Sequence, residues 1–143
     1  RLVGSEMCIR DSHHLDQLMD TATVTPSVNQ IELHPHLQQA EARAANDALG
    51  VVTQAWSPLK QAKVLDEETI VALAAKHDRT PAQIVIRSQL QEGVSTIPKS
   101  IKQHRIIENG DVFSFELDDE DMAAMRSLDK GDRVGPHPDM IDF

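Results

Sequence analysis

The chain alternates between two hydrophobic periods, and this alternation predicts short strands that are each followed by helices. Strand-like runs are expected at residues 28–33, 51–55 and 94–97, and turn-forming residues bound all three. Helical spacing is expected at residues 13–19, 37–49, 67–77, 81–91, 101–110 and 118–128. Strands that alternate with helices form a parallel sheet with right-handed crossovers, so the pattern indicates the α/β class.

Several of these helices begin at residues that suit a helix N-terminus. Thr80 and Gln83 have the spacing of a capping box, and so do Ser100 and Gln103. Asp66 is the expected cap of the helix over 67–77. Acidic residues at 118–121 suit the first turn of the last helix, because the helix dipole favours negative charge there. The alternating run 112–115 is expected to lie extended over a neighbouring helix.

Length and composition describe one globular domain with a core. Of the 143 residues, 40% are hydrophobic and 26% are charged, which is typical of folded domains. The formal net charge of −9 repels nucleic acid and anionic membranes, so neither is expected as a partner. The single cysteine, Cys8, excludes an internal disulfide and fits a reducing cytoplasm. No apolar run approaches the ~20 residues that cross a bilayer, and the N-terminus shows no apolar signal core.

Two features limit what the chain is expected to do by itself. Residues 1–12 show no clean period, and we expect them to be a poorly ordered arm or sequence foreign to the fold. Tyrosine is absent from the 143 residues. A mechanism that needs a phenolic acid is therefore not completed by this chain alone.

Candidate chemistry gathers at the C-terminal ends of the three strands, where parallel α/β folds bind their ligands. The residues found there, in chain order, are Gln30, Glu32 and His34, then Trp56, Ser57 and Leu59, and finally Lys99, Ser100, Arg105, Glu108 and Asn109.

The turn after the third strand has the features of an anion site. A proline ends the strand, and Lys99 and Ser100 then lead into a helix whose first N–H groups point at the same place. Arg105 adds a planar, forked cation. The alternative is a well-capped connection with solvated basic residues.

The other two strand ends add two more elements of a nucleotide site. Trp56 offers a flat face for a planar heterocycle, although an isolated tryptophan is more often core packing. Gln30 is able to pair with an amide, although a lone glutamine in a strand is usually structural. An aromatic ring for stacking (Trp56), a side-chain amide (Gln30) and a phosphate-binding group (Lys99, Ser100 and Arg105) together favour a nucleotide ligand.

Competing constellations have weaker support. His34 and His36 are two metal-type ligands without a third nearby in sequence. Glu32 and Asp66 are possible paired carboxylates, but nothing in the sequence fixes their separation. Neither a Gly-x-Gly-x-x-Gly motif nor a Walker A motif occurs, and no Gly-x-Ser-x-Gly elbow occurs either.

Several of these stretches together resemble the aldo-keto reductases, in particular bacterial members of the 2,5-diketo-gluconate reductase type. The likeness runs from about His13 to Phe143. It rests on VNQIELHP at 28–35, AWSPL at 55–59, IPKS at 97–100 with Arg105, Glu108 and Asn109, and RVGPHP at 133–138.

The resemblance implies a fold, an activity and a cofactor. The family is a (β/α)8 barrel that reduces aldehydes and ketones with NADPH, so residues 13–143 are expected to form the C-terminal portion of a TIM barrel. The resemblance implies that Gln30 bonds the nicotinamide carboxamide and that Trp56 stacks on the nicotinamide ring. It places Ser57 and Leu59 along the pyrophosphate. It also implies that Lys99 and Ser100 bind the 2′-phosphate with Arg105 beside it, and that Glu108 and Asn109 contact the adenine.

The resemblance also implies what this chain lacks. The catalytic Asp, Tyr, Lys and His of the family belong to the first half of the barrel, and no residue here matches them, so no catalytic residue is assigned. Three of eight strands do not close a barrel. The isolated chain is therefore expected to be marginally stable, to self-associate and to be inactive toward the family's small carbonyl substrates. A monodisperse, cooperatively unfolding monomer would contradict this.

Three alternatives to the cofactor-binding half of a reductase remain open. They are a non-catalytic NADP(H)- or nucleotide-binding fragment, an α/β interaction module, and a generic α/β piece without a ligand.

Overall fold

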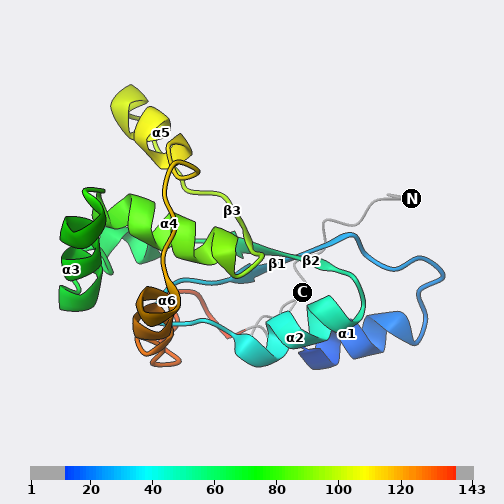
Figure 1. The fold of residues 1–143 in the computed structure, drawn as a ribbon. Coiled ribbons are helices and arrows are strands. Elements are labelled where there is room, and N and C mark those ends of the chain that lie inside the picture. Colours follow the sequence, from blue (N-terminus) through cyan, green and yellow to red (C-terminus); the bar gives the residue numbers. More distant parts are fainter. Residues whose placement is uncertain (1–11, 138–143) are drawn as a thin grey trace.

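The computed structural model describes residues 12–137, and the expected arm at 1–12 therefore lies outside the described residues except for Ser12. Figure 1 shows the elements, which are α1 (Ser12–Met19), β1 (Val28–Glu32), α2 (Ala40–Ala48), β2 (Val52–Trp56), the 3-10 turn η1 (Lys60–Ala62), α3 (Glu68–His77), α4 (Pro81–Gln91), β3 (Ser95–Thr96), α5 (Gln103–Gly110) and α6 (Asp119–Arg126). Strands and helices alternate as the sequence predicts. No helix in this part of the chain is long and apolar enough to cross a membrane.

The three strands form one parallel sheet in the order β1-β2-β3, which confirms the α/β prediction. Val28 lies opposite Val52 and Glu32 opposite Trp56, so β1 and β2 end side by side. β3 is shorter than the predicted 94–97. Its last sheet contact is the N–H of Ile97, which donates to the carbonyl of Ala55 at 3.4 Å, and the next residue is a proline without an N–H to donate.

Two apolar clusters form the core of the described residues. The smaller cluster lies between the strands and α2 and consists of Ile31, Leu33, Ala42, Ala55 and Val94. The larger cluster joins α3, α4 and α6 and is built mainly from Val64, Ile70, Leu73, Ala74, Ile84, Val85, Leu117, Met122, Met125 and Leu128. Burial of these side chains is the main driving force that packs α2 on the sheet and packs α3, α4 and α6 against one another.

A buried polar chain ties α2 to the two longer strands. The Asn29 amide donates to the Oδ1 of Asn46 at 3.0 Å, and the Asn46 amide donates to the Thr53 hydroxyl at 2.8 Å. Asn46 is fully buried. Such a chain fixes the position of α2 more specifically than apolar packing does, because each member needs its partner.

Two of the predicted helix starts are confirmed. The Thr80 hydroxyl accepts from the N–H of Gln83 at 3.3 Å, and the Gln83 side chain accepts from the N–H of Thr80 at 3.0 Å. Asp118 and Asp121 form the same reciprocal box at the start of α6. The acidic run at 118–121 is thus a helix start and not a free charge patch.

Three other predicted helix starts are wrong. Glu67 and not Asp66 is the N-cap of α3, without a side-chain hydrogen bond. α2 begins at Ala40 and not at residue 37, because His34 and Leu37 first exchange backbone hydrogen bonds of 3.1 and 2.8 Å in a tight turn. α5 begins at Gln103, because the Ser100 hydroxyl bonds the backbone of Lys102 at 3.3 Å instead of capping a helix.

The segment that follows α5 lies over α4, as its alternating pattern predicts. Val112 is buried, and its carbonyl accepts from the Arg87 guanidinium at 3.2 Å. The side chain of Gln91 also bonds Leu117, donating to its carbonyl and accepting from its N–H, both at 2.8 Å. These bonds fix the segment between α5 and α6 on the surface of α4.

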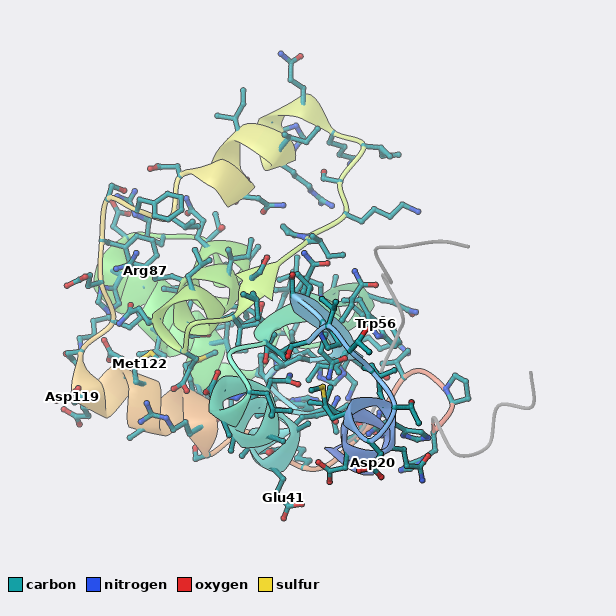
Figure 2. All side chains as sticks on the ribbon, turned by 90° about the vertical axis from the view of Figure 1, so that its right-hand side faces the viewer. Asp20, Glu41, Trp56, Arg87, Asp119 and Met122 are labelled. Atoms are coloured by element: carbon teal, nitrogen blue, oxygen red, sulfur yellow. The ribbon has the colours of Figure 1, made fainter. Side chains whose placement is uncertain are left out.

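α5 projects away from the rest of the molecule (Figures 1 and 2). None of its residues is buried, and the apolar side chains of Ile101, Ile106 and Ile107 are exposed on it and on the turn before it. Within the described residues β1 and β3 are each paired on one side only, so the sheet is open. Exposed apolar surface and open strand edges favour association, so the expectation of self-association stays a prediction with this physical support.

Asp121 is the group on which we expect the acid stability of the fold to depend. Its side chain is 3% exposed and accepts from Lys76 and His77, both at 2.7 Å. Burial opposes its ionisation, but these bonds and the N–H of Asp118 hold the pKa of Asp121 below its usual value.

We expect the free energy of unfolding to be highest above pH 5 and to fall as the pH drops below about 4, because the unfolded chain then takes up a proton that the folded Asp121 resists. The contribution of Asp121 is lost once the pH has fallen through its lowered pKa in the folded protein. Asp121→Asn should lower stability at pH 7 by about 1–3 kcal/mol and flatten its dependence on pH in the acid range. Urea unfolding followed by circular dichroism at pH 7 and pH 3 measures both. Asp119→Asn in the same helical turn is the control, because Asp119 is exposed; an equal effect of the two substitutions would refute the assignment.

Candidate functional site

A cleft of about 860 Å³ opens where β2 and β3 end. Its walls are the loop after β2, the first turn of α4, and the segment from Pro98 to Asn109. All of the predicted site residues except Gln30 line it, namely Trp56, Ser57, Leu59, Lys99, Ser100, Arg105, Glu108 and Asn109. Residues that are far apart in the sequence therefore share one cavity.

One wall of the cleft is cationic. Lys99, Lys102 and Arg105 all line it. In the part of the chain that the structure describes, the side chains of Lys99 and Arg105 have neither an ion pair nor a hydrogen bond, although the chain carries an excess of acidic residues. The N-cap of α5, Lys102, makes no side-chain cap, so the first N–H groups of this helix are also available to an anion.

Trp56 lines the same cleft at the end of β2, and Figure 2 shows its place beside the strands. The indole is half-buried. The loop that follows holds four non-glycine residues in the left-handed region, with φ of 55° at Ser57, 47° at Lys60, 55° at Gln61 and 69° at Ala62. Each of these residues is strained. The turn could not be predicted from the sequence, because none of the four residues is glycine.

A buried ionic network holds the strained loop in place. Lys60 is 6% exposed, and its ammonium contacts the Nδ1 of His36 at 3.0 Å and the carboxylate of Asp132. The Nε2 of His36 lies 2.7 Å from Glu67, which Lys130 also contacts at 3.0 Å. The hydrogen bond from Lys130 lowers the pKa of Glu67. This network joins the loops after β1 and β2 to the segment after α6.

The alternative of a metal site has no support in the described residues, where no cluster of three or more His, Cys, Asp or Glu suits a metal ion. His36 is engaged by Lys60 and Glu67, and His34 contacts Glu32 at 3.1 Å. Burial lowers the pKa of His34 against the opposing effect of Glu32.

The pairing of Glu32 with Asp66 also lacks support. Both oxygens of the Glu32 carboxylate accept backbone N–H groups, from Val134 at 2.6 Å and from Gly135 at 3.0 Å. Glu32 is 2% exposed, whereas Asp66 is exposed to solvent.

Gln30 lies apart from the other predicted residues. Its amide donates to the Gln54 side chain at 2.7 Å, and Gln54 in turn lies 3.4 Å from the Ser95 hydroxyl. The three residues form one polar row across β1, β2 and β3, where Gln30 is opposite Gln54 and Gln54 is opposite Ser95. That Gln30 hydrogen-bonds an amide group of a ligand stays a prediction.

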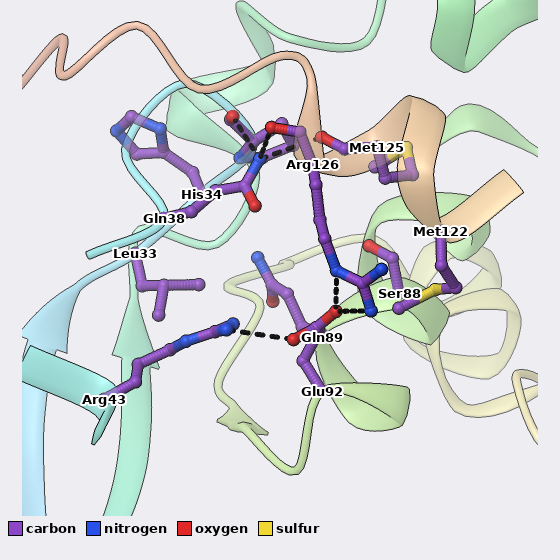
Figure 3. A pocket seen from close by; sticks show the side chains of 11 residues that line it. Leu33, His34, Gln38, Arg43, Ser88, Gln89, Glu92, Met122, Met125 and Arg126 are labelled. Carbon is purple, nitrogen blue, oxygen red and sulfur yellow. Dashed lines mark hydrogen bonds and ion pairs between the residues drawn. The ribbon is translucent and has the colours of Figure 1, made fainter. Parts of the chain in front are cut away.

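A second cavity lies between the loop after β1 and the ends of α4 and α6 (Figure 3). It holds about 30 Å³, which suits a water molecule and not a nucleotide. Beside it Glu92 bridges Arg43 at 2.9 Å and Arg126 at 2.6 Å. Burial opposes ionisation of Glu92, but the two guanidinium groups hold its pKa below the usual value. We therefore assign this cavity to the packing of α4 and α6 and not to the binding of a nucleotide.

Comparison with known proteins shows the family. The family model described as "Aldo/keto reductase family" matches residues 8–130, and the chain belongs to this family. This match confirms the predicted resemblance. It begins at Cys8, inside the stretch 1–12 that we expected to be a poorly ordered arm or sequence foreign to the fold.

Individual relatives and solved structures agree with this. The chain is 50% identical over 131 residues to the glyoxal reductase of Bacillus subtilis, covering 92% of this chain and 48% of the relative. It is 47% identical over 137 residues to the methylglyoxal reductase DkgA of Escherichia coli, covering 94% and 50%. The apo crystal structure of Gox0644 superposes with a TM-score of 0.89 at 46% identity, covering 93% of this chain and 49% of that one. A mutant of Gox0644 in complex with NADPH gives the same values. The chain thus spans about half the length of the curated relatives it matches.

We expect Ala62→Gly to raise the free energy of unfolding by about 0.5–1 kcal/mol, because glycine adopts a positive φ without a Cβ clash. Urea denaturation measures the change. Ala44→Gly is the matched control, since Ala44 is exposed inside α2 and should lose about 1 kcal/mol. A loss of stability in both variants would show that the loop at 60–62 is not strained in solution.

Proposed function

We propose that this chain carries the NADPH-binding half of an aldo-keto reductase that reduces aldehydes and ketones to alcohols. The observation that carries the proposal is the cleft that brings Trp56 together with the unpaired cations Lys99 and Arg105. A flat aromatic ring and a pair of free cations at two walls of one cavity are the groups that a phosphorylated dinucleotide requires.

The cleft fits such a cofactor in size and in chemistry. Its volume of about 860 Å³ lies within the range of roughly 300–1,000 Å³ that ligand pockets occupy. When bound, NADPH supplies a hydride to a carbonyl carbon. The residues of this chain bind and orient the cofactor and leave its reactive end at the sheet edge.

The proposed contacts follow the order of the walls. Trp56 holds the nicotinamide ring, and Ser57 and Leu59 border the pyrophosphate. Gln30, which does not line the cleft, has to exchange its bond to Gln54 before it holds the carboxamide. The 2′-phosphate and the adenine are held at the other wall by Lys99, Ser100, Arg105, Glu108 and Asn109. The Ser100 hydroxyl first has to leave its bond to the Lys102 backbone, which is a local bond and easily exchanged.

The substrate class that we propose is a small carbonyl compound. The relatives named glyoxal reductase and methylglyoxal reductase support it, because about half of each aligns with nearly all of this chain. We place the catalytic groups outside these 143 residues, since the sequence holds no tyrosine and no residue that matches the family's catalytic set. The single cysteine supports a reducing cytoplasm as the location.

A second candidate is binding without catalysis. The chain spans about half of its relatives, yet it contains a cleft that the described residues build by themselves. Under this hypothesis the chain is an NADP(H)-binding fragment or an interaction module. Binding and turnover measurements on the same protein distinguish it from the first proposal.

We expect Lys99→Ala and Arg105→Ala each to raise the Kd for NADPH about tenfold and to leave the Kd for NADH within about twofold, because only NADPH carries the 2′-phosphate. Cofactor fluorescence titration measures both constants. Lys63→Ala is the control, since Lys63 is exposed and does not line the cleft. Equal affinity of the unchanged chain for the two cofactors would argue against the phosphate clamp.

We expect the purified 143-residue chain to show no reduction of methylglyoxal by NADPH, because the proton-donating groups lie outside it. The loss of reduced nicotinamide absorbance measures the reaction. Turnover that disappears with Lys99→Ala would show that these residues suffice for catalysis and would overturn this part of the proposal.

A further inference from the structure

The segment after α6 returns to the sheet and ends against the tryptophan of the cleft. The N–H groups of Lys130 and Asp132 both donate to the carbonyl of His36, at 3.1 and 3.0 Å. Two residues later the segment meets the end of β1, where Glu32 accepts from Val134 and Gly135. A stretch that the sequence predicts as loop is therefore bound at several points.

Glu32 is built to hold this segment. It is 2% exposed and lies directly opposite Trp56 in the parallel register, so the two side chains share one face of the sheet. One oxygen accepts from Val134 and contacts His34, and the other accepts from Gly135. A carboxylate offers acceptors on both oxygens, whereas an amide would turn a donor toward one of the two N–H groups.

Gly135 makes the other half of the contact. A Cβ at this position would lie 2.7 Å from the Cη2 and 3.3 Å from the Cζ2 of Trp56, and 3.1 Å from a Glu32 oxygen. Any side chain would push the indole or the segment away. Only glycine lets the backbone rest against the ring edge.

We propose that Glu32 and Gly135 form a clasp that holds residues 133–135 against Trp56 and thereby fixes the indole at the nicotinamide end of the cleft. Glu32 and Gly135 are positioning residues, because they act through Trp56. The inference rests on the proposed NADPH site for its effect on the cofactor, whereas the effect on Trp56 itself is independent of it.

The chain provides its own reporter. Trp56 is the only tryptophan, and tyrosine is absent, so intrinsic emission comes from this one residue. In Glu32→Gln and in Gly135→Ala we expect the Trp56 emission to shift to longer wavelength and acrylamide quenching to increase, without any ligand. Glu120→Gln and Gly110→Ala are matched controls, since Glu120 is exposed and a Cβ at Gly110 meets no atom within 4 Å.

Binding of two ligands, one with and one without the nicotinamide, then shows which end of the cleft the substitutions affect. The Kd for NADPH should rise about tenfold in both variants, and the Kd for adenosine 2′,5′-bisphosphate, which lacks the nicotinamide, should stay within about twofold. A merely structural role would weaken both ligands together, and that result would overturn the positioning role. Unchanged Trp56 emission in both variants would overturn the clasp.

Failure of the proposed function is distinguishable from failure of the clasp. If the unchanged chain binds neither ligand, the NADPH site is refuted and so is the clasp's effect on the cofactor. The emission of Trp56 in the two variants then still decides whether the clasp exists.

Discussion

Parallel hydrogen bonding between β1, β2 and β3 brings three C-terminal strand ends to one edge of the sheet, and the cleft depends on this arrangement. Each strand end delivers different chemistry, with Glu32 from β1, Trp56 from β2 and Lys99 just after β3. An antiparallel neighbour would send its loop to the other edge. The helices between the strands are the crossovers that parallel pairing requires.

The loops at this edge are held by charge and by buried hydrogen bonds more than by apolar packing. Lys60 is buried in a left-handed conformation and is stabilised by His36 and Asp132, which come from two other parts of the chain. The cost of the strained turn is offset by this network, because a buried ammonium with good partners resists displacement. The same segment that supplies Asp132 continues to Glu32 and Trp56. One ionic network and one carboxylate clasp thus determine where the indole lies.

The cationic wall has the opposite character. Lys99 and Arg105 are exposed, and α5 contributes no residue to either core cluster. Long, exposed basic side chains without a partner keep their rotamer freedom until an anion binds. Under the proposed function, a half-buried aromatic ring and exposed cations would suit the two ends of a dinucleotide, since a ring needs a fixed surface to stack on and a phosphate accepts charge from several directions. The apolar residues of α5 remain uncovered in the described part of the chain.

The sequence was enough to predict the features that depend on neighbours within a few residues. It located the three strands, the capping box at Thr80, the acidic first turn at 118–121, and the family motifs whose residues line the cleft, because hydrophobic period and helix capping are local properties. It misplaced the starts of α2 and α5, where a tight turn and a local serine bond compete with the helix, and it placed the cap of α3 one residue early. The contacts of Glu32 with Gly135 and of Lys60 with Asp132 could be seen only in the folded chain, since these pairs lie 103 and 72 positions apart. No periodic signal marks such a pair, because it forms only after the sheet has set the place of each strand end.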